Sequence, residues 1–373
     1  MKFCIITHVV HSEINHKFYG YAPYINEMNI WLKHVDEVVI VAPKENFSLS
    51  PIHQAYNHAS IKFVEVKKFD ALTFSAKLKA IVSVIKNCIL IYRAMKNANH
   101  IHLRCPGNIG LLGCIVQLFF PKKHKTAKYA GNWDPKSKQP LSYRFQKWIL
   151  SSTFFTKNMQ VLVYGEWENQ TKNIKPFFTA TYSENQKQVV ALRHFTAPLK
   201  FLFVGTLSSG KQPIYAINLV QKLIENNKEC TLEIFGEGIE RTKLEHYIEE
   251  NKLEDIVFLR GNQSLETIKM AYCKSHFVIL PSKSEGWPKV IAEAMFWGCL
   301  PIASKVSCLP SMLNNGERGI LLEMNLNQDV TQVEQITNDE ETYLKMTLDA
   351  MIWSRKYTTD FFESEIKTLL QVY

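Results

Sequence analysis

Residues 277–303 read FVILPSKSEGWPKVIAEAMFWGCLPIA, which has the pattern of a strand, a loop, a helix and a second strand. The apolar runs 277–280 and 300–303 are typical of buried strands. Pro288 suits the first turn of a helix, where an amide hydrogen is not needed, and Gly298 is placed to end that helix. This order of elements predicts a unit of two parallel strands joined by a helix.

The same alternation of short apolar runs and helix-length amphipathic segments continues through both halves of the chain. In the first half the apolar runs are 3–6, 38–41, 61–66, 101–103 and 161–163, and in the second they are 201–204, 232–235, 256–259, 277–280 and 300–303. Each series predicts its own parallel sheet covered by helices. The predicted fold class is therefore α/β, with two Rossmann-like doubly wound domains facing across a cleft.

The domain boundaries follow from the polar stretch that separates the two series. A length of 373 residues allows two or three domains at about 150 residues each. We assign residues 1–185 to an N-terminal domain, 186–198 to a linker, 199–342 to a C-terminal domain and 343–373 to C-terminal helices.

Composition excludes several classes of protein. The longest apolar stretch, 109–120, is shorter than the roughly 18 residues that a membrane span needs. The first residues lack the pattern of a secretory signal, so we expect a cytoplasmic protein. The eight cysteines are scattered without a C-x-x-C pair, which predicts neither a disulfide framework nor a zinc site.

The charge is distributed unevenly along the chain. Residues 1–200 hold 27 Lys/Arg and 11 Asp/Glu, whereas 201–373 hold 17 and 24. A basic half suits an anionic membrane surface, a phosphorylated substrate or nucleic acid, but no nucleic-acid motif accompanies it, so no nucleic acid is expected. The basic segment 121–128 either rests on anionic lipid or is a solvated loop after a buried helix, and the sequence leaves both readings open.

The loop 281–288 and the helix after it form the best-marked candidate site. Free amides at a helix N-terminus, next to the flexible Gly286, favour a phosphate or diphosphate. Glu285 in the loop and Glu293 just over one turn into the helix can both border one pocket, where each would accept hydrogen bonds from sugar hydroxyls. The alternative is a solvated Glu285 that caps the helix and a Glu293 that merely favours it.

At these residues the chain resembles the nucleotide-sugar glycosyltransferases of the two-Rossmann GT-B fold, specifically retaining family 4, the glycosyl transferases group 1. The shared pattern is Pro281-Ser282, then Glu285, Glu293-Ala294-Met295 and Gly298-Cys299-Leu300-Pro301. The resemblance implies a C-terminal domain that binds the donor and an N-terminal domain that binds the acceptor. It also implies that residues 343–373 cross back to the N-terminal domain.

The resemblance assigns Lys211 to the donor diphosphate, Glu285 to hydroxyls of the donor sugar and Glu293 to the ribose. Thr206 stands where the family has an arginine, which removes one expected cationic contact. The donor-binding residues that it implies are Gly205, Thr206, Lys211, Gly236, Gly238, Arg260, Ser282, Glu285, Gly286, Trp287, Pro288, Lys289, Val290 and Glu293.

The resemblance also implies that His102 positions the donor sugar, so the predicted catalytic residues are His102, Lys211 and Glu285. A histidine at a strand end is otherwise an ordinary hydrogen-bonded group. The predicted acceptor-binding residues are His11, His16, Asn132, Trp133 and Asp134. The alternative for the last three is a loop capped by Asp134.

The implied reaction moves a hexose-like sugar from a nucleoside diphosphate sugar to an acceptor hydroxyl with retention. No Asp-x-Asp motif occurs, so neither a metal nor a cofactor beyond the sugar donor is expected. The acceptor would be a glycan or a lipid-linked sugar in bacterial surface polysaccharide or glycolipid assembly, with a peripheral place on the inner face of the membrane left open. The alternatives are a nucleotide-sugar epimerase on the same fold and a noncatalytic nucleotide-sugar binding protein.

Overall fold

The computed structural model describes residues 1–50, 52–68, 74–195 and 198–370, with only the helical backbone for 74–80. The chain divides into two compact units, Met1–Phe178 with Phe361–Tyr373, and Thr179–Asp360. The boundary between the two units thus follows Phe178, seven residues before the predicted end of the N-terminal domain at residue 185. Helix α11 (Glu340–Ser354) stays in the second unit, whereas most of α12 (Thr359–Leu370) belongs to the first.

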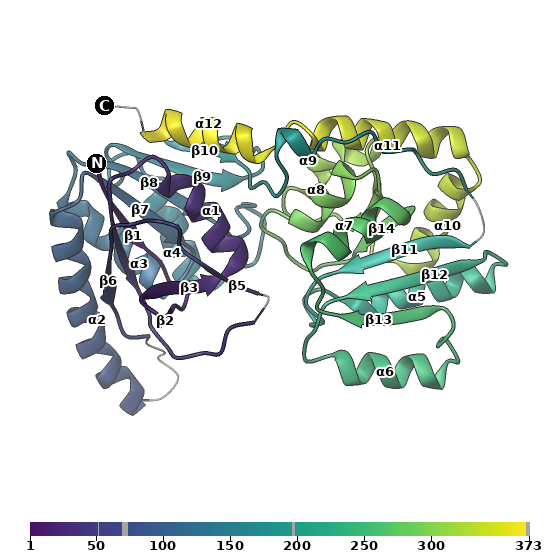
Figure 1. Cartoon of the computed structure of the whole chain (residues 1–373), viewed down its shortest axis with the longest axis horizontal. Helices are drawn as coiled ribbons and strands as arrows, with labels where there is room; N and C mark the ends of the chain where they lie inside the picture. Colours follow the sequence, from purple (N-terminus) through teal and green to yellow (C-terminus); the bar gives the residue numbers. More distant parts are fainter. Residues whose placement is uncertain (51, 69–73, 196–197, 371–373) are drawn as a thin grey trace. The chain divides into compact units, whose positions relative to one another are not determined.

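The first unit is built on a seven-stranded parallel sheet (Figure 1). Strand β1 lies inside the sheet between β7 and β4. The chain adds β4 and β6 on one side of β1 and β7 to β10 on the other, which is the doubly wound arrangement. In sheet order the strands are β10 (Ile174–Phe177), β9 (Met159–Tyr164), β8 (His124–Tyr129), β7 (His100–Cys105), β1 (Lys2–Ile6), β4 (Glu37–Ala42) and β6 (Ile61–Glu65).

Helices cover both faces of this sheet. Helices α2 (Phe74–Lys96), α3 (Asn108–Val116) and α4 (Leu141–Leu150) pack on one face, where Ile91, Leu112 and Ile149 join side chains of β1, β7 and β8 in one hydrophobic core. On the other face, Trp31 of α1 (Ala22–Leu32) stacks on Phe3 at 5.8 Å between ring centroids. The short strands β2 (Ser12–Ile14), β3 (Lys17–Tyr21) and β5 (His53–Ala55) form a separate antiparallel sheet.

The second unit repeats the plan with a six-stranded parallel sheet and its own core. In sheet order the strands are β13 (Val257–Gly261), β12 (Cys230–Phe235), β11 (Leu199–Val204), β14 (Phe277–Leu280), β15 (Leu300–Ser304) and β16 (Ile320–Leu322). The remaining helices are α5 (Pro213–Glu225), α6 (Arg241–Glu250), α7 (Leu265–Lys274), α8 (Lys289–Phe296), α9 (Leu309–Met312) and α10 (Leu326–Thr337). Two Rossmann-like doubly wound units confirm the predicted fold class.

The basic segment 121–128 is mostly not the loop that the sequence suggested. Residues 124–129 form the interior strand β8, and Lys125 and Lys128 are buried. Burial lowers the pKa of Lys125 to about 8, and its ammonium donates to the carbonyl of Phe120 at 2.7 Å. Neither of the two readings, a lipid-binding segment or a solvated loop, holds for the whole of 121–128, because its second half lies inside the sheet.

Among the described residues, no helix is both long enough and apolar enough to cross a membrane.

Candidate functional site

The loops that follow β11 and β14 lie next to each other, because these two parallel strands are paired in the sheet. Lys211 follows β11 and Glu285 follows β14. Their side chains meet, with 2.5 Å between Lys211 Nζ and Glu285 Oε1. The Glu285 side chain is 7% exposed and that of Lys211 is 30% exposed, so the pair lies at the rim of the unit rather than in open solvent. Sequence reasoning selected both residues, and the structure brings them together.

Further hydrogen bonds fasten these two loops to one another. The amide of Lys283 donates to the carbonyl of Gly210 at 2.8 Å, and the Gln212 side chain donates to the carbonyl of Pro281 at 2.5 Å. Ser282 is buried, and its hydroxyl has no hydrogen-bond partner among the described residues. The carbonyl of Gly286 accepts from the hydroxyl of Ser307 at 3.3 Å. The geometry around Glu285 is therefore held by the backbone as well as by Lys211.

Helix α8 begins directly after this loop and has no side-chain cap at its N-terminus, where Pro288 is the N-cap residue and Lys289 and Val290 open the helix. An uncapped helix N-terminus carries partial positive charge and favours anions. Trp287 packs beside it, with its ring 6.2 Å from that of Trp353. The loop and the start of α8 thus combine a lysine, a helix dipole and a buried carboxylate.

Glu293 in α8 has a different set of partners. Its carboxylate accepts from the hydroxyl of Thr181 at 2.6 Å and from that of Tyr272 at 3.4 Å. Burial first, and the charge of Glu293 second, raise the pKa of Tyr272 and of Tyr182 well above the ordinary value, so both phenols stay protonated, and Tyr272 is the one that donates to Glu293. Among the described residues, Glu293 and Glu285 share no hydrogen-bond partner, although the sequence suggested a common pocket. Sequence reasoning missed Thr181 and Tyr272, which carry no motif.

Gly236 and Gly238, in the loop after β12, allow that loop to pack closely on the loop after β11. A Cβ atom on Gly236 would lie 1.9 Å from the carbonyl oxygen of Gly205, and one on Gly238 would lie 2.3 Å from that of Leu207. Gly236 also has a φ of +139°. Thr206 is exposed in the same region. These glycines are needed to pack the loop after β12 on the loop after β11, whatever else they contact.

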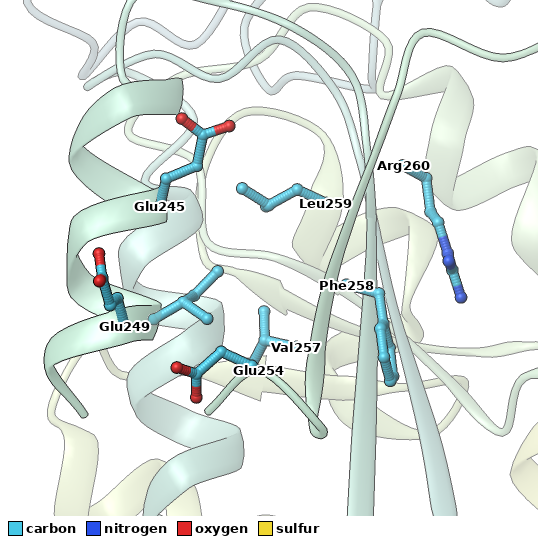
Figure 2. A pocket seen from close by; sticks show the side chains of 8 residues that line it. Glu245, Glu249, Glu254, Val257, Phe258, Leu259 and Arg260 are labelled. Atoms are coloured by element: carbon cyan, nitrogen blue, oxygen red, sulfur yellow. The ribbon is translucent and has the colours of Figure 1, made fainter. Parts of the chain in front are cut away.

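Arg260 lies at the edge of the second sheet and is engaged by a neighbouring strand. Its guanidinium is 2.7 Å from the carboxylate of Glu233 and lies over the ring of Phe258. It helps to line a shallow pocket with three glutamates of α6 and the turn after it, Glu245, Glu249 and Glu254. Figure 2 shows Leu259 facing the helix while Phe258 and Arg260 lie on the other side of the strand. The structure does not bring Arg260 to Lys211, Glu285 or Glu293.

In the first unit, His102 lies inside the core rather than at a surface. Its ring has no exposed area, stacks at 5.7 Å on Phe3, and bonds through Nδ1 to the hydroxyl of Thr126 at 2.8 Å. His100 bonds to the same hydroxyl at 2.9 Å. Burial lowers the pKa of both histidines to about 3. This placement disfavours the predicted contact of His102 with a donor sugar and matches the alternative, an ordinary hydrogen-bonded histidine.

The two histidines predicted to bind the acceptor, His11 and His16, differ in exposure. His11 is buried against Tyr56, with 3.0 Å between Nε2 and the phenol oxygen, and burial lowers its pKa to about 4. His16 is exposed in the turn between β2 and β3 with a φ of 60°.

The loop 132–134 is organised by its own side chains. The carboxylate of Asp134 accepts from the amide of Lys136 at 2.8 Å, and the Asn132 side chain accepts from the amide of Asp134 at 2.9 Å. Trp133 is 1% exposed and donates to Gln170 at 2.9 Å. It still borders a surface pocket with other residues that include Gln139, Arg144 and Lys147. A loop capped by Asp134 and a pocket beside Trp133 are therefore both present.

A buried charged cluster at the carboxyl ends of β7 and β8 was missed by sequence reasoning. Glu27 of α1 is 2.9 Å from Lys128 and 3.4 Å from Arg104. The Lys128 side chain has no exposed surface, and its ammonium also donates to the carbonyl of Phe178 at 3.1 Å. Such a cluster leaves no sequence signal, because its members lie far apart in the chain and occupy a helix and two strands.

No group of three or more His, Cys, Asp or Glu side chains within the described part of the chain is arranged to hold a metal ion.

Comparison with known proteins finds a family model that matches most of the second unit. Residues 184–350 match the model of the glycosyl transferases group 1. An uncharacterized glycosyltransferase of Haemophilus influenzae is 30% identical over 174 residues, which are 45% of this chain and 48% of that protein. The poly(glycerol-phosphate) alpha-glucosyltransferase of Bacillus subtilis is 25% identical over 219 residues, 57% of this chain and 31% of that protein. The matches thus span about half or less of the length of these curated relatives.

Among solved structures, Anabaena HepE in complex with UDP and glucose superposes with a TM-score of 0.69. The superposition covers 100% of both chains at 15% sequence identity. At that identity the likeness shows the fold alone, and it extends the shared fold to both units. The GT-B fold implied by the resemblance of residues 281–301 is thereby confirmed, and the matching family model is the one that the resemblance indicated.

Proposed function

We propose that the chain is a glycosyltransferase that uses a nucleoside diphosphate sugar, since residues 184–350 match the model of the glycosyl transferases group 1. It transfers the sugar to an acceptor hydroxyl with retention at the anomeric carbon. The observation that carries the proposal is the contact between Lys211 and Glu285 at the carboxyl ends of two adjacent strands. Ligands of open α/β sheets bind at these strand ends.

The chemical demand of such a transfer is to stabilise the negative charge that grows on the departing diphosphate. Lys211 supplies one fixed cation, and the uncapped start of α8 supplies a positive helix end a few residues beyond Glu285. Glu285 holds the lysine before the donor arrives. With the donor bound, the lysine neutralises phosphate oxygens, and the Glu285 carboxylate accepts hydrogen bonds from the sugar. Because these groups provide the charge, we propose that the enzyme needs no metal.

For Glu293 we propose a contact with the ribose hydroxyls. The carboxylate already accepts hydrogen bonds from Thr181 and Tyr272, so its orientation is fixed without a ligand. A carboxylate can accept about four hydrogen bonds, which leaves capacity for a ribose hydroxyl beside the two protein donors.

The relatives support the choice of substrates. HepE was crystallised with UDP and glucose, and the Bacillus subtilis relative is named for alpha-glucosyl transfer to a poly(glycerol phosphate). We therefore propose a role in bacterial surface polysaccharide or glycolipid assembly, with a glycan or lipid-linked acceptor.

The test is a thermal-shift and turnover screen of the full chain with a panel of nucleoside diphosphate sugars, since a ligand that binds the folded state raises the unfolding temperature. One donor should stabilise the protein and be consumed, and its consumption should persist in EDTA. Glu293→Ala should weaken binding of that donor about tenfold or more, whereas the control Glu225→Ala, on the exposed side of α5, should not. Unchanged donor affinity in Glu293→Ala would contradict the ribose contact.

The same screen separates the two alternatives. Release of an epimerised sugar without an acceptor would identify an epimerase. Donor binding without consumption by any acceptor preparation would identify a noncatalytic binding protein. NMR of the product reports whether the anomeric configuration is retained, and inversion would overturn that part of the proposal.

A further inference from the structure

Helix α2 is apolar on two sides. Its inner side packs Ile91 and Met95 into the core of the first unit. On its outer side, Ile85, Ile89 and Tyr92 recur at helical spacing and are 56%, 46% and 41% exposed. A helix on the surface of a water-soluble unit ordinarily carries polar residues on its outer side. The exposed apolar residues on the outer side of α2 therefore indicate a binding surface.

The exposed stripe of α2 continues onto the next part of the helical layer. A groove with mainly apolar walls runs between α2 and the short helix η1 (Gln117–Phe119), lined by Val84, Ile85, Cys88, Ile89, Tyr92, Val116 and Phe119, with Arg93 and Lys96 at its margin. Phe119 is 70% exposed, and its ring lies 6.1 Å from that of Tyr92. We call this groove, with the outer side of α2, the α2 face.

A second group of aromatic rings lies on the same helical layer. Phe145 and Trp148 of α4 stack at 5.7 Å, and Phe154 after α4 is 73% exposed. Helices α2, α3 and α4 all pack on one face of the sheet, so these rings and the α2 face belong to the outer surface of one layer. Half of the large hydrophobic side chains that are exposed in the described structure fall within residues 81–154, which makes this surface distinct from the rest of the molecule.

The same part of the chain has a single sign of charge. Residues 71–133 contain ten Lys and Arg and no Asp or Glu. Lys86, Arg93 and Lys96 are exposed on α2, and Lys122 is exposed just beyond η1. Within the described residues, none of these four side chains forms an ion pair. The exposed apolar groups are thus bordered by cations that no carboxylate of the described residues neutralises.

We propose that the α2 face docks on an anionic lipid bilayer. Apolar and aromatic side chains at this surface enter the boundary between headgroups and acyl chains, while the adjacent cations meet lipid phosphates. A second copy of the chain fits less well, because it would bring the same positive charge to the contact. Nucleic acid would meet the cations but leave the apolar groove without a partner. The inference does not depend on the proposed activity.

The test is sedimentation of the full chain with sucrose-loaded vesicles of phosphatidylglycerol and phosphatidylcholine, or of phosphatidylcholine alone, at low salt. The protein should sediment with the anionic vesicles and lose most of its binding when salt is raised. The variant Ile85→Glu/Ile89→Glu should lower the vesicle partition coefficient about tenfold or more. The matched control is Ile239→Glu, a residue of the second unit that is 90% exposed, and it should bind as the wild type does.

Circular dichroism and the thermal midpoint establish that each variant is folded. The proposal is overturned if the wild type stays in the supernatant with anionic vesicles, or if Ile85→Glu/Ile89→Glu sediments as the wild type does. It is also overturned if light scattering shows a wild-type dimer that this variant converts to a monomer without a change in vesicle binding, since the α2 face would then join two copies of the chain.

Discussion

Lys211 and Glu285 are 74 positions apart in the sequence, yet Lys211 Nζ lies 2.5 Å from Glu285 Oε1. The pairing of β11 with β14 brings the loops that carry them together. The lysine is therefore positioned without a ligand, at the place where the proposed transfer needs positive charge.

Replacement of this lysine tests the proposed mechanism. Lys211→Met should lower kcat about 100-fold with a smaller effect on KM, because the lost charge acts mainly on the transition state. The matched control is Lys222→Met, which removes a lysine of α5 that is paired with Glu225 on the surface. Steady-state kinetics with the donor found in the screen provide the measurement. Wild-type kcat in Lys211→Met would refute the role.

The contact between the loops after β11 and β12 predicts a stability effect. Gly236→Ala should lower the free energy of unfolding by about 3 kcal/mol, because the new Cβ meets the carbonyl of Gly205 at 1.9 Å and the backbone is strained. Gly316→Ala is the control for backbone strain alone, since Gly316 has a φ of +113° and an added methyl group would meet no atom within 4 Å. It should cost about 1 kcal/mol. Urea denaturation compares them, and equal losses would show that the loop contact is unimportant.

The buried cluster of Glu27, Arg104 and Lys128 predicts a second effect on the free energy of unfolding. Glu27→Ala should lower the free energy of unfolding by about 3 to 5 kcal/mol, because it leaves the fully buried Lys128 without its carboxylate. Glu37→Ala removes an exposed carboxylate paired with Lys2 and should leave the unfolding curve unchanged. If the two variants unfold alike, the buried ion pair does not stabilise the first unit.

The buried histidines predict acid sensitivity. Burial lowers the pKa of His102 to about 3 from an ordinary value of 6.5, so between these values the unfolded chain binds a proton that the folded chain does not. Stability therefore falls as the pH drops below about 6.5, by about 1.4 kcal/mol per pH unit for each such histidine. His100 and His11, with pKa values lowered to about 3 and about 4, act in the same direction.

The variant His102→Gln removes one of these titrating groups. Its free energy of unfolding, measured in urea between pH 6 and pH 4.5, should fall less steeply than that of the wild type by about 1.4 kcal/mol per pH unit. An unchanged slope would show that His102 is protonated in the folded protein.

The fold was predictable where the apolar pattern is strong. The run Phe277 to Leu280 and the proline and glycine that border α8 predicted the strand, loop and helix that the structure contains. Strand β8 was obscured, because Lys125 and Lys128 are charged in sequence but find a carbonyl and a carboxylate inside the sheet. Burial of a charged residue depends on partners that are distant in sequence.

The candidate site was predictable only where residue type and spacing coincide. Glu285 and Lys211 carried a recognisable pattern, and the paired strands join them. Thr181 and Tyr272 carried none, although both bind Glu293. For His102, alternation along the strand could not distinguish a side chain at the edge of the sheet from one inside the core, which is where the neighbouring Phe3 and Trp31 hold it.

Helix α12 completes the first unit only after the second unit has been synthesised. Phe362 packs on Phe177, and its ring lies beneath the ammonium of Lys128, so the first unit contains residues that a ribosome makes after the whole of the second. During translation, about 180 residues of the second unit are made between Phe178 and α12. Until α12 is made, the surface of the first unit that Phe362 covers stays exposed.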